Sequence, residues 1–157
     1  MERVVLVTGG SRGIGAATAR LAASMGWAVA VNYAARRDAA DGIVRQIERD
    51  GGRALAVQAD VADEGQVLAM FEQVDRQLGR VTDLVNNAGV VDVAQRVDEM
   101  SAARLQRMFA VNVIGSFLCA REAVRRISTR HGGPGGAIVN VSSAARRLGS
   151  GARYPDY

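Results

Sequence analysis

Residues 8–15 (TGGSRGIG) form a glycine-rich segment whose composition suits it to hold a phosphorylated ligand. The segment follows an apolar run of strand length and precedes a stretch with helical periodicity. Glycines at such a junction allow a tight turn, so that backbone N–H groups and the positive end of a helix dipole approach a pyrophosphate. The spacing is Gly-xxx-Gly-x-Gly and differs from the commoner Gly-x-Gly-xx-Gly. The segment predicts a dinucleotide-binding turn, with a plain glycine turn as the alternative.

Apolar runs of strand length alternate with helical periodicity along the chain. This alternation is typical of βαβ units, in which helices cover both faces of a parallel sheet. We therefore expect the α/β class and a Rossmann fold, with a doubly wound parallel sheet, over a single dinucleotide-binding domain of residues 1–157. The expected strands are 3–8, 27–33, 54–58, 83–86 and 137–141.

The helices between these strands are placed by their apolar faces and end signals. The first should end at Gly26 in a left-handed conformation. A long helical stretch should begin at Ser101 as N-cap, run to about Arg130 and stop at the glycine-rich residues 132–136. The expected buried face of the first helix is Ile14, Ala17, Thr18, Leu21, Ala22 and Met25. Those of the next two are Ala40, Ile43, Val44, Ile47, Val67, Met70, Phe71, Val74 and Leu78. On the long helix, Leu105, Met108 and Phe109 form one stripe, continued by Asn112, and Val113, Phe117, Ala120, Val124 and Ile127 add a wider apolar surface.

The composition excludes several classes of function. The 157 residues are 48% hydrophobic and 23% charged, which is the balance of a compact domain with an apolar core. One cysteine, Cys119, and one histidine, His131, argue against a disulfide framework and a zinc site, so we expect no metal. The basic residues are all arginine and are not interleaved with aromatics, so we expect no nucleic-acid partner. No apolar run reaches the roughly 20 residues of a membrane span, and we expect a cytoplasmic protein without a membrane partner.

The glycine-rich turn resembles that of the short-chain dehydrogenase/reductase family, and three further segments match this family in the same order. Asn86–Gly89 (NNAG) ends the fourth expected strand, Asn112 lies in VNV on the long helix, and Ser142 and Ser143 close the fifth strand. Tyr157 falls where members place the tyrosine of a Tyr-xxx-Lys motif. The resemblance spans the whole chain and is nearest to the branch of 3-oxoacyl-carrier-protein reductases and glucose dehydrogenases.

The resemblance implies an enzyme that interconverts a small-molecule carbonyl and a secondary alcohol by hydride transfer. In that reading Asn112 holds a water in a proton relay, Ser143 orients the substrate carbonyl, and Tyr157 is the general acid/base. Without the family, Asn112 would be a buried structural amide and Ser143 a turn residue. Tyr154 competes with Tyr157, but the proline that follows it disfavours helical backbone.

The type of cofactor is argued from charges. A site that prefers NAD usually carries an acidic side chain at the end of the second strand, where this sequence has Asn32. Arg12 in the turn and Arg36 and Arg37 after the second strand offer positive charge for a 2′-phosphate, so we expect NADP(H) rather than NAD(H). The alternative is that these arginines are only solvated.

The resemblance also implies an adenine clamp at Asp60 and Val61, with a plain turn at Asp60 as the alternative. The expected cofactor-binding residues are Gly9, Ser11, Arg12, Gly13, Ile14, Gly15, Asn32, Tyr33, Arg36, Asp60, Val61, Asn87, Ala88 and Gly89.

The lysine of the Tyr-xxx-Lys motif, which would lower the pKa of the tyrosine, is not among these 157 residues. We therefore expect the chain to be part of a longer enzyme that lacks here its C-terminal strands and substrate-binding region. A non-catalytic dinucleotide-binding module or redox sensor is the alternative. The wide apolar surface of residues 101–130 predicts a homodimer or homotetramer, because relatives pair through this helix.

Overall fold

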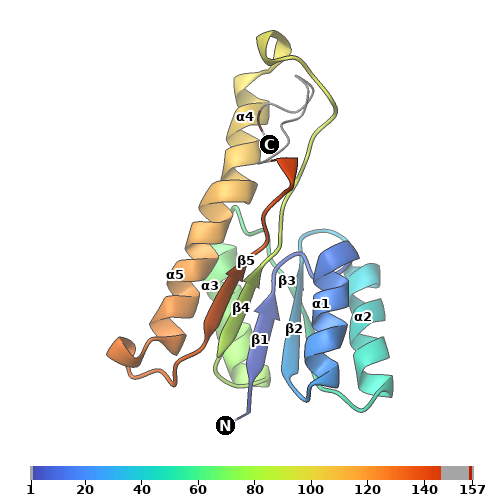
Figure 1. Ribbon diagram of the computed structural model, residues 1–157, viewed down its shortest axis with the longest axis vertical. Coiled ribbons are helices and arrows are strands. Elements are labelled where there is room, and N and C mark those ends of the chain that lie inside the picture. The colour runs from blue at the N-terminus through green and yellow to red at the C-terminus, as the bar shows by residue number, and fades with distance from the viewer. Residues whose placement is uncertain (1, 146–155, 157) are drawn as a thin grey trace.

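A parallel β-sheet forms the centre of the structure, a computed structural model that describes residues 2–145 and 156. In this part of the chain the strands lie in the order β3-β2-β1-β4-β5 (Figure 1). The chain moves outward from β1 to β3 and then returns to add β4 on the other side of β1, so the strand order reverses there. Sheets with this reversal bind ligands beside it, at the carboxyl ends of the strands. The strands are β1 (Val4–Val7), β2 (Ala28–Tyr33), β3 (Ala54–Gln58), β4 (Asp83–Asn86) and β5 (Ala137–Asn140).

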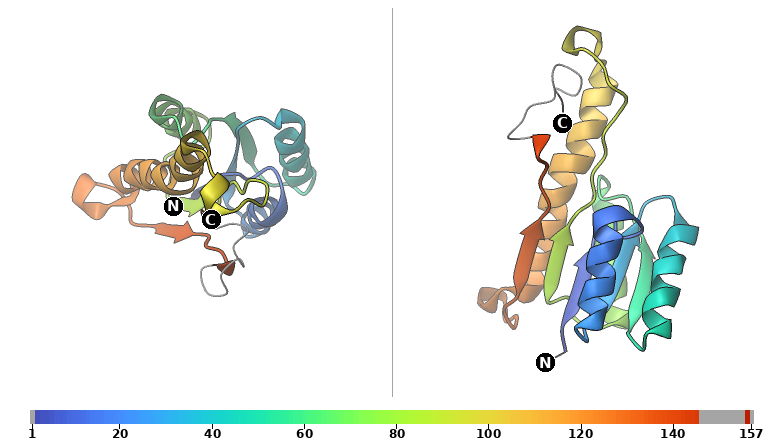
Figure 2. Two further views of the ribbon diagram at one scale, coloured as in Figure 1. Left: turned by 90° about the horizontal axis from the view of Figure 1, so that it is seen from above. Right: turned by 45° about the vertical axis from the view of Figure 1, so that its right-hand side comes forward.

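Helices cover both faces of this sheet (Figure 2). On one face α1 (Gly13–Ser24) and α2 (Arg37–Arg49) pack against β1 and β2, and on the other α3 (Glu64–Gln77) and α5 (Gly115–Ile127) enclose a second apolar layer. The expected doubly wound Rossmann architecture is confirmed.

One long helical rod extends beyond the carboxyl ends of the strands (Figure 1). It begins with α4 (Ala102–Phe109), continues through a π-helical turn (Ala110–Ile114) and ends with α5. The Ser101 side chain caps α4 by accepting a hydrogen bond from the Arg104 N–H at 3.2 Å, as predicted. Short 3-10 turns flank the rod at Val97–Glu99 and Thr129–His131. The rod thereby carries residues of α4 and the π-turn to the edge where ligands bind.

The buried face of α3 is the one that its periodicity predicts. Val67, Met70, Phe71 and Val74 are all buried and pack against the sheet. Gly26 also follows the first helix with φ +82°, as expected of a left-handed C-terminus.

The predicted face of α1 is wrong except for Ala22, which is buried. Ile14, Leu21 and Met25 are each more than 60% exposed, whereas the buried side is a stripe of small residues. The valine side chains of β1 and β2 already fill the layer beneath the helix, so α1 approaches the sheet on groups no larger than a methyl. The buried stripe is Gly15, Ala16, Ala19 and Ala22.

The predicted stripe on α4 is also wrong in part. Met108 is buried, but Leu105 and Phe109 are exposed. The buried partner of Met108 is instead Arg104, one turn earlier. The buried face therefore runs through Arg104 and Met108, and not through Leu105 and Phe109, because the charge of Arg104 is matched inside the protein.

Among the described residues, no helix is both long and apolar enough to cross a membrane. The same part of the chain holds no group of three or more His, Cys, Asp or Glu side chains placed to bind a metal ion.

Candidate functional site

The β1–α1 turn is shaped by two glycines. Gly9 has φ +61°, and a Cβ there would lie 2.9 Å from the Ala88 Cα. A Cβ on Gly15 would lie 2.5 Å from both the Asn87 side-chain nitrogen and the Gly9 carbonyl oxygen. Any side chain at these positions would push the turn away from the segment that follows β4.

Asn32 anchors the turn to β2. Its Oδ1 accepts a hydrogen bond from the Gly9 N–H at 3.1 Å, and its Nδ2 donates to the Ala59 and Val57 carbonyls at 3.0 and 3.3 Å. The side chain is buried, and both ends of its amide bind backbone. Asn32 borders the cavity described below, but its amide holds the turn and the end of β3 together.

Asn87 and Thr8 anchor the turn to β4 in the same way. Asn87 Nδ2 donates to the Thr8 and Gly9 carbonyls at 2.9 and 3.0 Å. Thr8 Oγ1 accepts from the N–H groups of Asn87 and Ala88, each at 3.0 Å, and donates to the Val85 carbonyl. The turn is thus fastened on both sides by buried or half-buried polar side chains.

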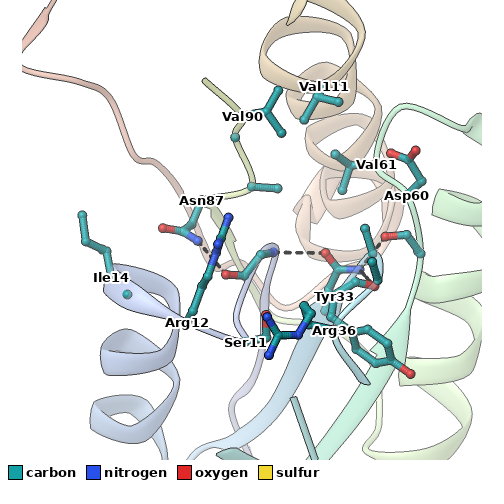
Figure 3. Close-up of a pocket in the computed structure, with 18 of the residues that line it drawn as sticks. Ser11, Arg12, Ile14, Tyr33, Arg36, Asp60, Val61, Asn87, Val90 and Val111 are labelled. Atoms are coloured by element: carbon teal, nitrogen blue, oxygen red, sulfur yellow. Dashed lines mark hydrogen bonds between the residues drawn. The ribbon is translucent and has the colours of Figure 1, made fainter. Parts of the chain in front are cut away.

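A cavity of about 560 Å³ opens in front of this turn (Figure 3). The N-terminus of α1 borders it and has no side-chain cap and no acidic residue in its first turn, so its N–H groups and positive dipole end are available to an anion. Every predicted cofactor residue except Gly15 lines the cavity. Residues that the sequence did not indicate also line it, namely Ala34, Ala35, Ala59, Val90, Arg107 and Val111.

Three arginines line this cavity, and one of them, Arg107, is paired with Asp92. Arg12 is exposed and has no ion-pair partner among the described residues. Arg36 lies 3.3 Å from the Asp38 carboxylate, a hydrogen-bonded pair that raises the pKa of Arg36 and lowers that of Asp38. Both side chains of this pair are largely exposed, so the pair is weak and easily exchanged for another anion. Arg37 instead pairs with Asp41 along α2 at 3.5 Å.

Asp60 and Val61 form the wall opposite α1 (Figure 3). Asp60 Oδ1 accepts the Ala62 N–H at 2.9 Å, which is the turn geometry considered as its alternative role. Val61 is buried against the start of α5, where a Cβ on Gly115 would lie 2.8 Å from Val61 Cγ2.

Asn112 lies in the π-turn, a distortion often found at functional sites. Its Oδ1 accepts the Val90 N–H at 2.8 Å and its Nδ2 donates to the Val90 carbonyl at 2.9 Å. These two bonds pair the side-chain amide with the loop that follows β4, and Gly89 lies beside it.

A second cavity of about 700 Å³ brings Asn112 and Ser143 together with Ile14 and Asp156. Ser142 borders it too, and Ser143 Oγ accepts the Ala145 N–H at 3.1 Å. The two cavities share Ile14 and residues 87–90, so they adjoin at the end of β4. Tyr154 and Tyr157 lie outside the described residues.

This arrangement fits a dinucleotide cofactor. The glycine turn has no side chains that would keep a pyrophosphate away from the backbone at Gly9 and Gly15. The uncapped N-terminus of α1 supplies N–H donors to such a group. The Ser143 hydroxyl and the Asn112 amide border the adjoining cavity, where a reacting group beside such a cofactor would lie.

Comparison with known proteins places this geometry in a family. The family model described as short chain dehydrogenase matches residues 3–155. The chain is 51% identical over 154 residues to the Escherichia coli (strain K12) protein named uncharacterized oxidoreductase YgfF, covering 98% of this chain and 62% of that one. It is 38% identical to the 3-oxoacyl-[acyl-carrier-protein] reductase of Synechocystis sp., over 94% of this chain and 58% of the relative.

Solved structures agree with this assignment. A dehydrogenase/reductase from Sinorhizobium meliloti 1021 superposes with a TM-score of 0.89 at 35% identity, covering 99% of this chain and 59% of that one. A Serratia marcescens short-chain dehydrogenase/reductase double mutant gives 0.85 at 39% identity, over 96% and 59% of the two chains. The chain thus spans about three-fifths of the length of these relatives. On its sequence, fold and turn geometry, the chain belongs to the short-chain dehydrogenase/reductase family.

Proposed function

We propose that residues 1–157 form the dinucleotide-binding domain of an NADP(H)-dependent oxidoreductase that interconverts a small-molecule carbonyl and a secondary alcohol. The observation that carries this proposal is the junction of two cavities at the end of β4. One is bordered by the uncapped N-terminus of α1, and the other by Asn112 and Ser143. The carbonyl class agrees with the name of the Synechocystis relative.

The residues of the first cavity would hold the cofactor. The backbone N–H groups of the turn would bind the pyrophosphate, and Asp60 and Val61 would border the adenine. When bound, the nicotinamide supplies or accepts a hydride.

Three side chains would handle the proton and the substrate oxygen. The Ser143 hydroxyl would donate a hydrogen bond to the carbonyl oxygen, and Tyr157 would exchange a proton with it. Asn112, held by Val90, would keep a water in place for relay of that proton. A free phenol has a pKa of about 10, so the tyrosine needs a nearby cation to work at neutral pH.

The preference for the 2′-phosphorylated cofactor is supported by Arg12 and Arg36. Both line the cavity, and the partner of Arg36 is an exposed carboxylate that a phosphate can replace. The Asn32 amide beside them is neutral and engaged with backbone.

Titration of the full chain with NADPH and NADH tests the proposal, with binding followed by nucleotide fluorescence. We expect Arg36→Ala to weaken NADPH binding about tenfold, as expected for one charged hydrogen bond, and to leave NADH almost unchanged. Arg12→Ala should also weaken NADPH more than NADH; equal losses would show that Arg12 does not contact the 2′-phosphate. Arg37→Ala, whose partner is on α2, is the matched control. Binding of neither nucleotide would refute the proposal, and binding without turnover of any ketone in a panel would favour the non-catalytic module.

We also propose a homodimer or homotetramer through the 101–130 helix. Phe109, Val113, Phe117 and Val124 are exposed along the rod at spacings of four, four and seven residues, which places them on one side of a helix. Light scattering of the full chain tests this, and a stable monomer would contradict it. The cytoplasm remains the proposed compartment, in keeping with the free, buried Cys119.

A further inference from the structure

Arg104 is a buried charged residue of α4. The pattern of apolar residues on this helix predicts that Leu105 and Phe109 are buried instead. Its side chain is 6% exposed, and that of its partner Asp156 is 1% exposed. A charge at this depth needs partners that replace water.

Among the described residues, the guanidinium of Arg104 binds Asp156, Val93 and Gln95. Nε and Nη2 donate to the two oxygens of Asp156 at 2.8 and 3.2 Å, which is a bidentate pair. Nη1 donates to the Val93 carbonyl at 2.8 Å and to the Gln95 side-chain oxygen at 3.0 Å. The planar guanidinium therefore fixes the direction of each partner as well as its distance.

One of these partners lines the second cavity, and the other two lie in the loop beside it. Asp156 borders the cavity that also contains Asn112 and Ser143. Val93 and Gln95 lie in the loop whose Val90 holds the Asn112 amide.

We propose that Arg104 and Asp156 are positioning residues that fix the loop of residues 90–96, and with it the Asn112 amide, beside the cavity that Asp156 and Ser143 border. The pair ties Asp156 to α4, and the same guanidinium holds the loop behind Asn112. This inference rests on the proposed function, because it assigns the proton relay to Asn112.

A buried ion pair is by itself weak support for a stabilising role, since a pair of apolar residues often stabilises as well. The ion pair differs from an apolar pair because its hydrogen bonds fix the direction in which the two side chains meet. The hydrogen bonds from Arg104 lower the pKa of Asp156, which keeps the carboxylate charged at neutral pH.

Steady-state kinetics of the full chain with the preferred nucleotide and a ketone test the inference. The variants are Arg104→Met, Asp156→Asn and the double variant Arg104→Met/Asp156→Asn. The double variant removes both charges of the pair and retains most of the side-chain volume, so it should fold even where a single variant does not. Arg126→Met is the matched control, because Arg126 is also mostly buried and joins α5 to Asp75 on α3, at a distance from both cavities.

We expect kcat to fall about 10- to 100-fold in the double variant, as a displacement of about 1 Å at a reacting group would produce. The dissociation constant of the nucleotide should stay within two-fold, and Arg126→Met should leave both constants unchanged. Hydrogen exchange should rise in peptides that contain Asp156 or residues 90–96 and stay constant in the peptide of residues 8–15.

A folded double variant with the kcat of the original protein would overturn the inference. Equal losses of kcat and nucleotide affinity would also overturn it, because they would show a general loss of structure. Failure of the proposed function has a different signature, since the unsubstituted chain would then bind no nucleotide or reduce no ketone.

Discussion

The two cavities are bordered by different kinds of groups. At the β1–α1 turn the groups available to a ligand are backbone N–H groups, while the Asn32 and Asn87 amides are consumed in holding that backbone. Near the π-turn the roles of backbone and side chain are exchanged. There the backbone of Val90 and Val93 forms hydrogen bonds that hold the side chains of Asn112 and Arg104 in place. Function at the β1–α1 turn should therefore be lost when a substitution adds atoms. Function at the π-turn should be lost when a substitution removes them.

The largest effect is expected from adding a side chain to the turn. Gly15→Val would place atoms within 2.5 Å of Asn87 and the Gly9 carbonyl and push α1 away from the turn. We expect nucleotide affinity to fall by more than about 100-fold, since several charged hydrogen bonds are lost together. Fluorescence titration measures this.

The matched control for that change is Gly42→Ala on α2, where the nearest atom to an added Cβ is 4.0 Å away. It should leave nucleotide binding unchanged and raise the free energy of unfolding by about 0.5–1 kcal/mol, because alanine favours helix. Strong nucleotide binding by Gly15→Val would show that the turn is not the phosphate site.

Removing side-chain atoms at the π-turn should lower turnover and leave nucleotide binding unchanged. Asn112→Ala leaves the N–H and the carbonyl of Val90 without their partner. We expect kcat to fall about 100-fold with little change in nucleotide affinity, a size typical of a lost acid–base group. Asn112→Asp can accept from the Val90 N–H but cannot donate to its carbonyl at neutral pH, so it should restore only part of the activity. A parallel loss of affinity would contradict the separation of the two regions.

Changing Asn32 should lower stability without switching the cofactor. Asn32→Asp would turn a carboxylate oxygen toward the Ala59 and Val57 carbonyls, where the amide now donates. We expect the free energy of unfolding to fall by about 3 kcal/mol at neutral pH, and by less in acid, where a protonated carboxyl can donate again. Urea unfolding at both pH values measures this. An NADH preference gained at unchanged stability would show that the side chain faces the ribose instead.

The smallest effect concerns Cys119. Burial in the α5 core raises the pKa of its thiol to about 12, with a smaller contribution from Glu122. Because the reactive form is the thiolate, roughly one thiol in ten thousand is reactive at pH 8. We expect alkylation at pH 8 only when urea unfolds the chain, and rapid labelling of the native protein would contradict the burial.

The sequence predicted the elements and the position of the glycine turn between β1 and α1, because both depend on local spacing. The α3 face follows from the positions of Val67, Met70 and Phe71, and the turn from its glycines. The α1 face was mistaken, because alanines occur on both sides of that helix and only packing against filled strands selects the smaller side.

The partners of polar residues could not be predicted. Arg104 and Asp156 are 52 positions apart, and a single arginine on a helix has the same pattern as a solvated one. The roles of the Asn32 and Asn87 amides depend on carbonyls brought near by the sheet, and nothing in residues 110–114 signals a π-turn.

That wider helical turn has a consequence for insertions and deletions. An α-helix advances by about 100° per residue, so removing one residue from 110–114 to restore regular geometry would rotate one half of the rod against the other. The α5 half is held to the sheet through Cys119 and Ala123, so the α4 half would swing. Asn112 would lose Val90, and the guanidinium of Arg104 would face solvent instead of Asp156. The length of this short segment is thus as constrained as the identity of any side chain in it.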